Sequence, residues 1–346
     1  MEELILIYTE RFKNNPTFYY GLTICASWAG VGSLLNSITM TQTYGIVPSL
    51  IWSAANIIAC ILFGWTVHKL PTLREVIRTK VARYSLSVIA IFNIWLNMTG
   101  IQTVFSETTI GVEGGTILAY AVAITFVVLL LWRGMIRNIL TDGASWIAVY
   151  FLIFVITILA YANSGGEFNS ASWGLNSEAI GIGFHKALLL LSGPFIYIYF
   201  YEMIEYNDSN IDGTNRVNMQ KAFTLGGLLF GLYMIFAFSL AFVKFPPALS
   251  FLKAILISLI AISTLSTFIF SIYLVFGRKL GLIIDVIAIS TWSMVSNLGV
   301  MGIWTVGATV RSYLAVMFIL VAIGITMGRQ KYEERIRAQT INDCRR

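Results

Sequence analysis

The sequence is poor in charged residues. Asp, Glu, Lys and Arg make up 12% of its 346 residues, about half the share found in soluble domains. Its hydrophobic share is 57% and its mean hydropathy is +0.78. These values exclude a soluble enzyme and predict an integral membrane protein.

Residues that build catalytic and metal centres are also scarce. The chain has three cysteines, Cys25, Cys60 and Cys344, and two histidines, His68 and His185. They form no disulfide framework or metal motif, and no phosphate-cradling glycine loop is present. We therefore expect no enzyme activity, no ATP-driven transport, no cofactor and no metal other than a coupling ion.

Apolar runs of 17 to 27 residues fill most of the chain, and each can cross a ~30 Å hydrocarbon core as a helix. They lack the alternating polarity of a membrane β-barrel. The predicted fold class is all-α, a polytopic membrane protein with about 10 transmembrane helices, at 18–43, 46–68, 85–105, 116–132, 145–162, 181–203, 222–243, 250–276, 281–299 and 305–327.

The basic residues indicate the topology. Lys and Arg gather in the loop 69–83 and in the tail 328–346, whereas Glu107, Glu113 and Glu178 lie in loops of the other side. Because cytoplasmic loops carry the excess of Lys and Arg, we expect a protein of the cell (inner) membrane with both termini on the cytoplasmic side. The net charge of +6 thus reflects the topology. Membrane lipid is the expected partner of the basic residues. No basic stripe indicates nucleic acid.

Ten spans divide into two sets of five, and an odd number reverses the second set relative to the first. The predicted organisation is a cytoplasmic lead-in, a first five-helix repeat, an extracellular amphipathic segment, a second inverted five-helix repeat and a basic cytoplasmic tail. Their ranges are 1–17, 18–162, 163–180, 181–327 and 328–346.

The first span of each set carries a helix-weakening cluster. Span 1 contains Gly30 and Gly32 among small polar residues, and span 6 contains Ser192-Gly193-Pro194. Such residues also serve close helix packing. At matching places of inverted halves, however, they indicate the central site of a transporter. We therefore predict that helices 1 and 6 are broken.

Two local motifs predict helix starts. Thr72 and Glu75 have the spacing of a capping box ahead of a short cytoplasmic helix, and Thr141-Asp142-Gly143 predicts the N-cap of the fifth span.

Several stretches resemble the sodium/solute symporter family, whose members have the five-plus-five inverted-repeat fold of the bacterial leucine transporter. These stretches are WAGVGSLLNSITMTQTYG at 28–45, PTLREVIRTKVARY at 71–84, IWLNMTGIQ at 94–102, WRGMIRNILTDGASW at 132–146 and AISTLSTFIFS at 261–271. Glu202 and Glu205 stand where the family has a polar signature, which leaves the class of solute open.

The resemblance implies a Na⁺ site between the first and eighth core helices. Its ligands would be the hydroxyls of Ser263 and Thr264 and backbone carbonyls near Asn36 and Thr39. Hard cations prefer such oxygen ligands. Without the family, the hydroxyls can equally be packing residues that bond to the preceding turn.

The solute is expected at the two helix breaks. Asn97 matches the position where sugar-carrying relatives use an Asn, and Tyr199 and Phe200 resemble the family's inner gate. A buried amide can also serve an interhelical hydrogen bond, and aromatic residues can form an interfacial belt. The predicted substrate-binding residues are Trp28, Ser37, Asn97, Ser192, Gly193 and Tyr197.

Six ionisable residues lie near the ends of spans, and we expect most of them to reach an interface by snorkelling. They are His185, Lys186, Glu202, Glu205, Asp285 and Arg311. No mid-bilayer carboxylate is recognised, which favours Na⁺ over a proton relay. Glu202 and Asp285 are the first candidates if the coupling ion is a proton.

The sequence therefore predicts a secondary active transporter that couples Na⁺ to symport of a small polar organic solute. One alternative is a proton-coupled amino-acid or amine permease of the same fold. Another is a transporter-like receptor or membrane subunit, although no motif indicates a protein partner.

Overall fold

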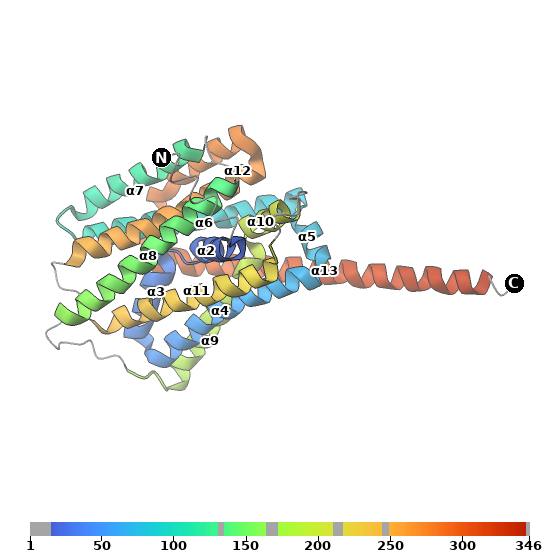
Figure 1. The fold of residues 1–346 in the computed structure, drawn as a ribbon, viewed down its shortest axis with the longest axis horizontal. Helices are drawn as coiled ribbons and strands as arrows, with labels where there is room; N and C mark the ends of the chain where they lie inside the picture. Colours follow the sequence, from blue (N-terminus) through green and yellow to red (C-terminus); the bar gives the residue numbers. More distant parts are fainter. Residues whose placement is uncertain (1–14, 131–134, 164–171, 210–216, 244–248, 344–346) are drawn as a thin grey trace.

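The computed structural model of the chain describes residues 15–130, 135–163, 172–209, 217–243 and 249–343. Most of the predicted lead-in, half of the amphipathic segment and Cys344 lie outside these residues. The chain is an all-helical, multi-pass membrane protein, and no strand occurs in the described ranges (Figure 1).

The helices follow the predicted spans closely. They are α2 (Pro16–Trp28), α3 (Val31–Tyr44), α4 (Ile46–Lys69), α5 (Pro71–Ile77), α6 (Lys80–Ser106), α7 (Gly111–Leu130), α8 (Met135–Asn163), α9 (Ser177–Leu191), the 3₁₀ turn η1 (Gly193–Ile196), α10 (Ile198–Ser209), α11 (Met219–Ser239), α12 (Ser250–Thr291) and α13 (Gly299–Asp343). Among described residues, eight helices are long and apolar enough to cross a membrane, and the bent pair of α2 and α3 makes a ninth.

Helix α12 contains two crossings. Its 42 residues would span about 63 Å if straight, twice the hydrocarbon core. Gly277 interrupts it with a φ of 73°, in the left-handed region that favours glycine. Before this turn, α12 runs antiparallel to α6, because Arg83 donates to the Leu274 carbonyl and Asn97 accepts from Thr264.

After the turn, α12 runs parallel to α6. The Trp95 indole donates to the carbonyl of Ala288 at 2.7 Å, and the Trp292 indole donates to Thr99 Oγ1 at 2.9 Å. The two limbs therefore run in opposite directions, and the hairpin raises the number of crossings among described residues to the predicted ten.

The two halves of the chain use similar contacts. Helix α2 packs against α8 and α11, and α9 packs against α13 and α4. These partners correspond if α4 matches α11 and α8 matches α13. An inverted five-helix repeat predicts this pattern, while the repeat boundaries themselves stay predictions.

The predicted capping box does not form. Helix α5 begins at Pro71, whose fixed φ suits a first helical position. The Thr72 hydroxyl donates across to the Ala322 carbonyl of α13 at 3.2 Å, and Glu75 pairs with Arg329 of α13. Both side chains that would have capped α5 instead tie it to α13.

The predicted N-cap at Thr141-Asp142-Gly143 is also wrong. Helix α8 already begins at Met135, so these residues lie inside it. Asp142 is only 1% exposed, because it packs against α12.

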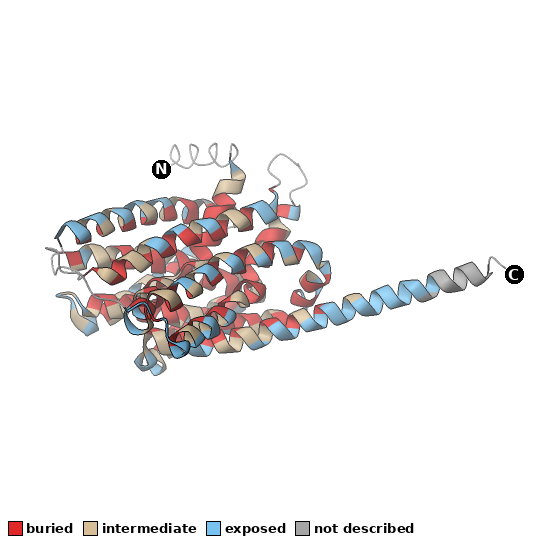
Figure 2. Cartoon of the chain, turned by 90° about the horizontal axis from the view of Figure 1, so that it is seen from below, coloured by how far each residue is buried: buried red, intermediate tan, exposed pale blue. Residues whose placement is uncertain are grey.

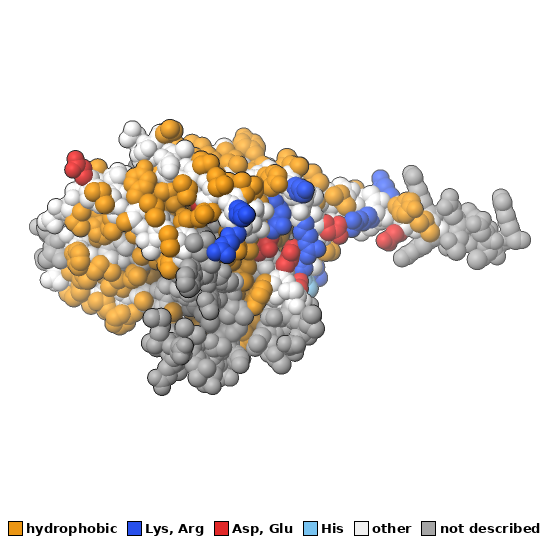
Figure 3. All heavy atoms as spheres, turned by 90° about the horizontal axis from the view of Figure 1, so that it is seen from above, with side chains coloured by type: hydrophobic (Ala, Val, Ile, Leu, Met, Phe, Trp, Pro, Cys, Tyr) orange, Lys and Arg blue, Asp and Glu red, His pale blue; other side chains and the backbone are white. Residues whose placement is uncertain are grey.

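Charge is concentrated at one end of the bundle. Figure 3 shows Lys, Arg, Asp and Glu side chains together where α13 leaves the bundle, while the rest of the described surface in this view is mainly apolar side chains and uncharged atoms, with an acidic group at the far end. Beyond this point α13 continues as an exposed helix (Figure 2). We call this end, formed by α5, the end of α10, the Gly277 turn and α13 near Arg329, the basic end.

Candidate functional site

The first span is broken between α2 and α3. The two helices meet at an angle of 63°, and the break falls at Ala29 and Gly30. The Ala29 N–H makes the last regular helical hydrogen bond of α2, to the Cys25 carbonyl at 2.7 Å, whereas the Gly30 N–H bonds to the Trp28 carbonyl at 3.1 Å and leaves the Ala26 carbonyl. Carbonyls in the last turn of α2 therefore lose their helical donors and become available to other groups.

The sixth span is broken at the corresponding place. Helix α9 ends at Leu191, η1 follows, and Tyr197 has an extended backbone before α10 begins. Pro194 occupies the start of η1, where its missing N–H disrupts no helical hydrogen bond. Both predicted helix breaks are thus present in the structure.

The two breaks touch each other. The Tyr197 hydroxyl donates to the Ser27 carbonyl at 3.1 Å, so a side chain of one break binds a carbonyl freed by the other. A Cβ placed on Gly193 would lie 1.9 Å from Trp28 Cη2. Only glycine at this position lets the Trp28 ring pack against the second break.

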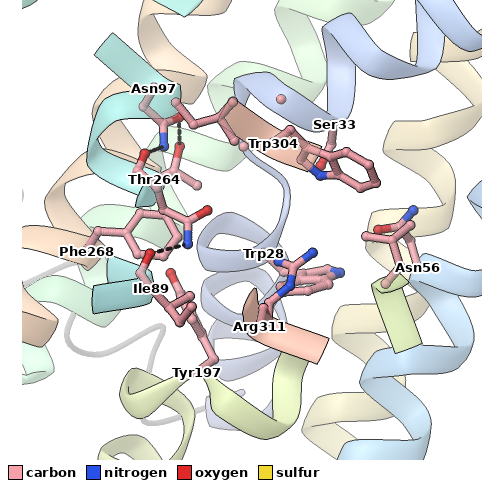
Figure 4. A pocket seen from close by; sticks show the side chains of 15 residues that line it. Trp28, Ser33, Asn56, Ile89, Asn97, Tyr197, Thr264, Phe268, Trp304 and Arg311 are labelled. Carbon is pink, nitrogen blue, oxygen red and sulfur yellow. Dashed lines mark hydrogen bonds between the residues drawn. The ribbon is translucent and has the colours of Figure 1, made fainter. Parts of the chain in front are cut away.

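A small cavity of about 40 Å³ lies between the breaks (Figure 4). Side chains of α2, α4, α6, α12 and α13 surround it together with the backbone of the first break. Its lining includes Trp28, Gly30, Asn56, Asn93, Asn97, Tyr197, Thr264, Trp304 and Arg311.

The structure brings three of the six predicted substrate residues, Trp28, Asn97 and Tyr197, into this lining. Ser192 instead bonds to the hydroxyl of Ser312 on α13 at 2.9 Å, just outside the cavity. Gly193 lies beneath Trp28, and Ser37 is buried on α3 away from the lining.

Ser263 and Thr264 point to different neighbours. The Thr264 hydroxyl lies 3.0 Å from Asn97 Oδ1 of α6 and also within hydrogen-bond distance of the Ile260 carbonyl of its preceding turn, so its one proton is shared between these two acceptors. Ser263 donates to Asp142 Oδ1 of α8 at 3.2 Å. Only Ser263 is therefore placed next to a carboxylate.

The carbonyls of Asn36 and Thr39 are not at the break. Both residues lie inside the regular helix α3, beyond Gly30. They line a second, larger cavity of about 570 Å³ near Glu107 and Lys253, away from Ser263. The carbonyls that the resemblance implied as ligands therefore lie beyond the break, about two turns further along α3.

Tyr199 and Phe200 are fully buried. Tyr199 contacts Phe270 of α12, and the Phe200 ring packs at 5.6 Å from Phe63 and 5.1 Å from Phe223. Phe63, Phe200 and Phe223, together with Phe195 and Tyr201, form what we call the aromatic layer, between the cavity and the basic end.

Below the aromatic layer, arginines near α5 and the start of α6 pair with acids of α10. Arg83 pairs with Glu202, Arg78 donates to Glu205 at 2.7 Å, and Arg74 donates to Asp208 at 2.9 Å. Glu205 holds the Arg78 guanidinium in its charged form, which raises the Arg78 pKa. Glu202, a predicted proton carrier, is thus engaged in an ion pair.

Sequence reasoning missed the burial of two charged residues. Arg311 is 7% exposed and Asp285 is 1% exposed, so neither snorkels to an interface. Asp142 was read only as a helix cap, although it lies at a buried position opposite Ser263. A helix start predicted at Met135 would have put Asp142 inside a span.

Comparisons with known proteins add little. No protein-family model matches this sequence, and no curated protein sequence matches it. This chain is similar to a crystal structure of the Eremococcus coleocola manganese transporter in complex with an aromatic bis-isothiourea substituted compound. The alignment covers 92% of this chain and 72% of the transporter chain. The two chains are 13% identical, with a TM-score of 0.39. Similarity this low carries no argument about the site, and the symporter family stays a resemblance.

Proposed function

We propose that this chain is a secondary transporter that couples Na⁺ to the uptake of a small polar solute by alternating access. The observation that carries the proposal is the meeting of two broken helices around one small cavity, linked by the Tyr197–Ser27 hydrogen bond. Broken helices expose backbone groups that a bound ion or solute can satisfy.

The Na⁺ ligands that fit best are the Asp142 carboxylate and the Ser263 hydroxyl, 3.2 Å apart. Further oxygens would come from carbonyls freed where α2 ends. Hard cations take carboxylate, hydroxyl and carbonyl oxygens together. Compared with the expectation from sequence, this proposal keeps Ser263, adds Asp142 and omits Thr264, Asn36 and Thr39.

A proton is the second candidate for the coupling ion. Asp142 supports it, because a buried carboxyl group can bind a proton as well as a cation. Its hydrogen bond with Ser263 can form in either protonation state, with the carboxyl group as acceptor when ionised and as donor when protonated. The two candidates differ in a simple way. A proton-coupled carrier depends on pH and is indifferent to the choice of Na⁺ or K⁺.

We assign the basic end to the cytoplasm, because Lys and Arg accumulate on that side of a membrane. With this orientation, the larger cavity near Glu107 and Lys253 faces outward. At −100 mV, each positive charge that moves inward contributes ~2.3 kcal/mol to uptake.

The test is the thermal stability of the purified chain in Na⁺ and in K⁺ at equal ionic strength. An ion that binds only the folded protein stabilises it by about 1.4 kcal/mol at ten times its Kd. We expect a rise specific to Na⁺ in the wild type, its loss in Asp142→Asn and its reduction in Ser263→Ala. Ser258→Ala is the matched control, because Ser258 lies on the same limb of α12 and its hydroxyl donates to the Ala254 carbonyl of its preceding turn.

A wild-type protein with no Na⁺-specific shift would contradict Na⁺ coupling. If stability and uptake then followed pH and Asp142→Asn removed that dependence, the proton-coupled alternative would replace it. Solute uptake into proteoliposomes separates both from a receptor, which binds solute without accumulating it.

A further inference from the structure

Arg311 is a buried cation with no anionic partner among the described residues. It lies on α13, is 7% exposed and is the only charged residue in the lining of the central cavity. Its Nε and Nη2 atoms are buried and make no hydrogen bond within the described part of the chain. Arginine cannot give up its proton in such a place, so the charge must be stabilised by something else.

The Trp28 ring supplies only part of this stabilisation. The Arg311 guanidinium stands 5.2 Å from the ring centroid, and the electron-rich face of the ring attracts its positive charge. It leaves the N–H donors unsatisfied, and an unpaired charge is costly in a buried site. The indole N–H of Trp28 is likewise buried, with no acceptor in the described ranges.

The two unpaired atoms of Arg311 are covered by protein atoms in this conformation, so a partner reaches them when the side chains around the cavity move. Nε and Nη2 share one edge of the guanidinium and direct their N–H bonds in parallel, which matches the two oxygens of a carboxylate. We propose that the solute is a small carboxylate, bound bidentately by Arg311 between the two helix breaks. This inference rests on the proposed function and names the class of its solute.

Other groups around the cavity agree with this assignment. The side-chain N–H groups of Asn56 and Asn93 donate to the carbonyls of Trp52 and Ile89, each at 2.9 Å. Their amide oxygens remain as acceptors, which suits an ammonium or hydroxyl group on the same solute. A volume of about 40 Å³ equals roughly three water molecules, so the carboxylate carries few further atoms.

A second cation lies close to the cavity. The Lys186 ammonium is 5.7 Å from the ring of Trp304, which lines the cavity, and 5.3 Å from the ring of Tyr44. Positive charge beside a cleft raises the local concentration of anions. Arg311 and Lys186 thus favour an anionic solute both at the site and near it.

The test measures stabilisation of the purified full chain by acetate and by glycine, at constant Na⁺ and ionic strength. Acetamide and glycinamide are the matched ligands, because they keep the size and lose the carboxylate. We expect acetate or glycine to stabilise the wild type and the amides to have no effect. A preference for glycine over acetate would show that the carboxylate belongs to an amino acid, and the reverse that it belongs to a simple acid.

The variants are Arg311→Gln and Arg311→Lys. We expect roughly 10- to 100-fold weaker carboxylate binding in Arg311→Gln. Arg311→Lys keeps the charge and loses the bidentate edge, so its affinity should be intermediate. The matched control is Arg278→Gln, an exposed arginine at the Gly277 turn. If Arg311→Gln does not fold, Arg311→Lys against Arg278→Gln still decides the question.

Three results would overturn the proposal: equal stabilisation by the amides, equal stabilisation by chloride, or unchanged carboxylate affinity in Arg311→Lys and Arg311→Gln. The Na⁺ response keeps the two proposals separate. A Na⁺-specific shift without any carboxylate response rejects the carboxylate and leaves the Na⁺-coupled transporter intact. A carboxylate response without a Na⁺ response rejects Na⁺ coupling alone.

Discussion

The two ends of the bundle differ in how much protein separates the central cavity from the surface. Toward the basic end, Tyr197 of the cavity is eleven residues before Asp208, about 16 Å along a helix. The aromatic layer and three ion pairs occupy this distance.

Toward the other end the barrier is thin. Ser33 lines the central cavity and Asn36, one turn later on α3, lines the 570 Å³ cavity. On α13, Trp304 and Met301 are related in the same way. The structure is therefore closed at the basic end and almost open at the other, which is one of the two conformations that alternating access requires.

The largest effect is expected in the aromatic layer. Phe200→Ala removes a fully buried ring that packs between Phe63 and Phe223, and such truncations cost about 3–5 kcal/mol. Thermal unfolding should show the loss, and a cysteine at Asn97 should become reactive from the basic end. Leu298→Ala is the control, because Leu298 is exposed at the opposite end. Equal effects of both changes would contradict the view that the aromatic layer closes the cavity toward the basic end.

The ion pair nearest the cavity should matter next. Arg83→Ala leaves Glu202 mostly buried without its partner, which costs about 1.5–3 kcal/mol and favours opening of the basic end. Lys253→Ala breaks the pair with Glu107 at the other end, where Glu107 is half exposed, and should leave accessibility from the basic end unchanged. Cysteine labelling from each side measures both. Greater exposure of the basic end in Lys253→Ala would reverse our assignment of the two barriers.

A smaller effect is expected one turn further out. The Arg78 side chain is 60% exposed, and exposed pairs contribute about 0.2–1 kcal/mol. Arg78→Ala should therefore lower the melting temperature less than Arg83→Ala, and high salt should reduce the difference from wild type. If the two variants are equally unstable, the ion pairs do not weaken with distance from the cavity.

The smallest effect concerns the pair between α5 and α13. The hydrogen bond from Arg329 lowers the pKa of Glu75 below its usual 4.5. Its contribution is therefore complete above the unfolded pKa and is lost as pH falls through the folded pKa. Melting curves of wild type and Glu75→Gln should differ slightly at neutral pH and converge in acid. A difference that grows in acid would contradict this pairing.

The spans were predictable because their apolar lengths match a bilayer, and both breaks were predictable because Gly30 and Pro194 weaken helices locally. The partners of polar side chains were not predictable. Thr72 bonds to α13 instead of capping α5, because α5 begins at Pro71 and Thr72 lies inside its first turn. Only tertiary packing decides between such partners.

The central site was predicted in part for the same reason. Trp28 and Tyr197 lie next to the breaks and could be found from local sequence, whereas Asn97 was found from the family resemblance. Arg311 and Asp142 could not be found in either way, because each resembled an interfacial residue near the end of its span. Their burial follows from how far α8 and α13 extend, and helix ends are what local patterns define least well.

The claim that the two ends open alternately can be tested by measuring distances between spin labels. Cys25, Cys60 and Cys344 are first replaced. One pair of labels is then placed across the basic end at Lys69 and Arg278, and another across the opposite end at Thr43 and Val112. All four labelled positions are exposed. When Na⁺ and a small carboxylate are added or removed, we expect one distance to lengthen as the other shortens. Two fixed distances, or two that change in the same direction, would contradict alternating access.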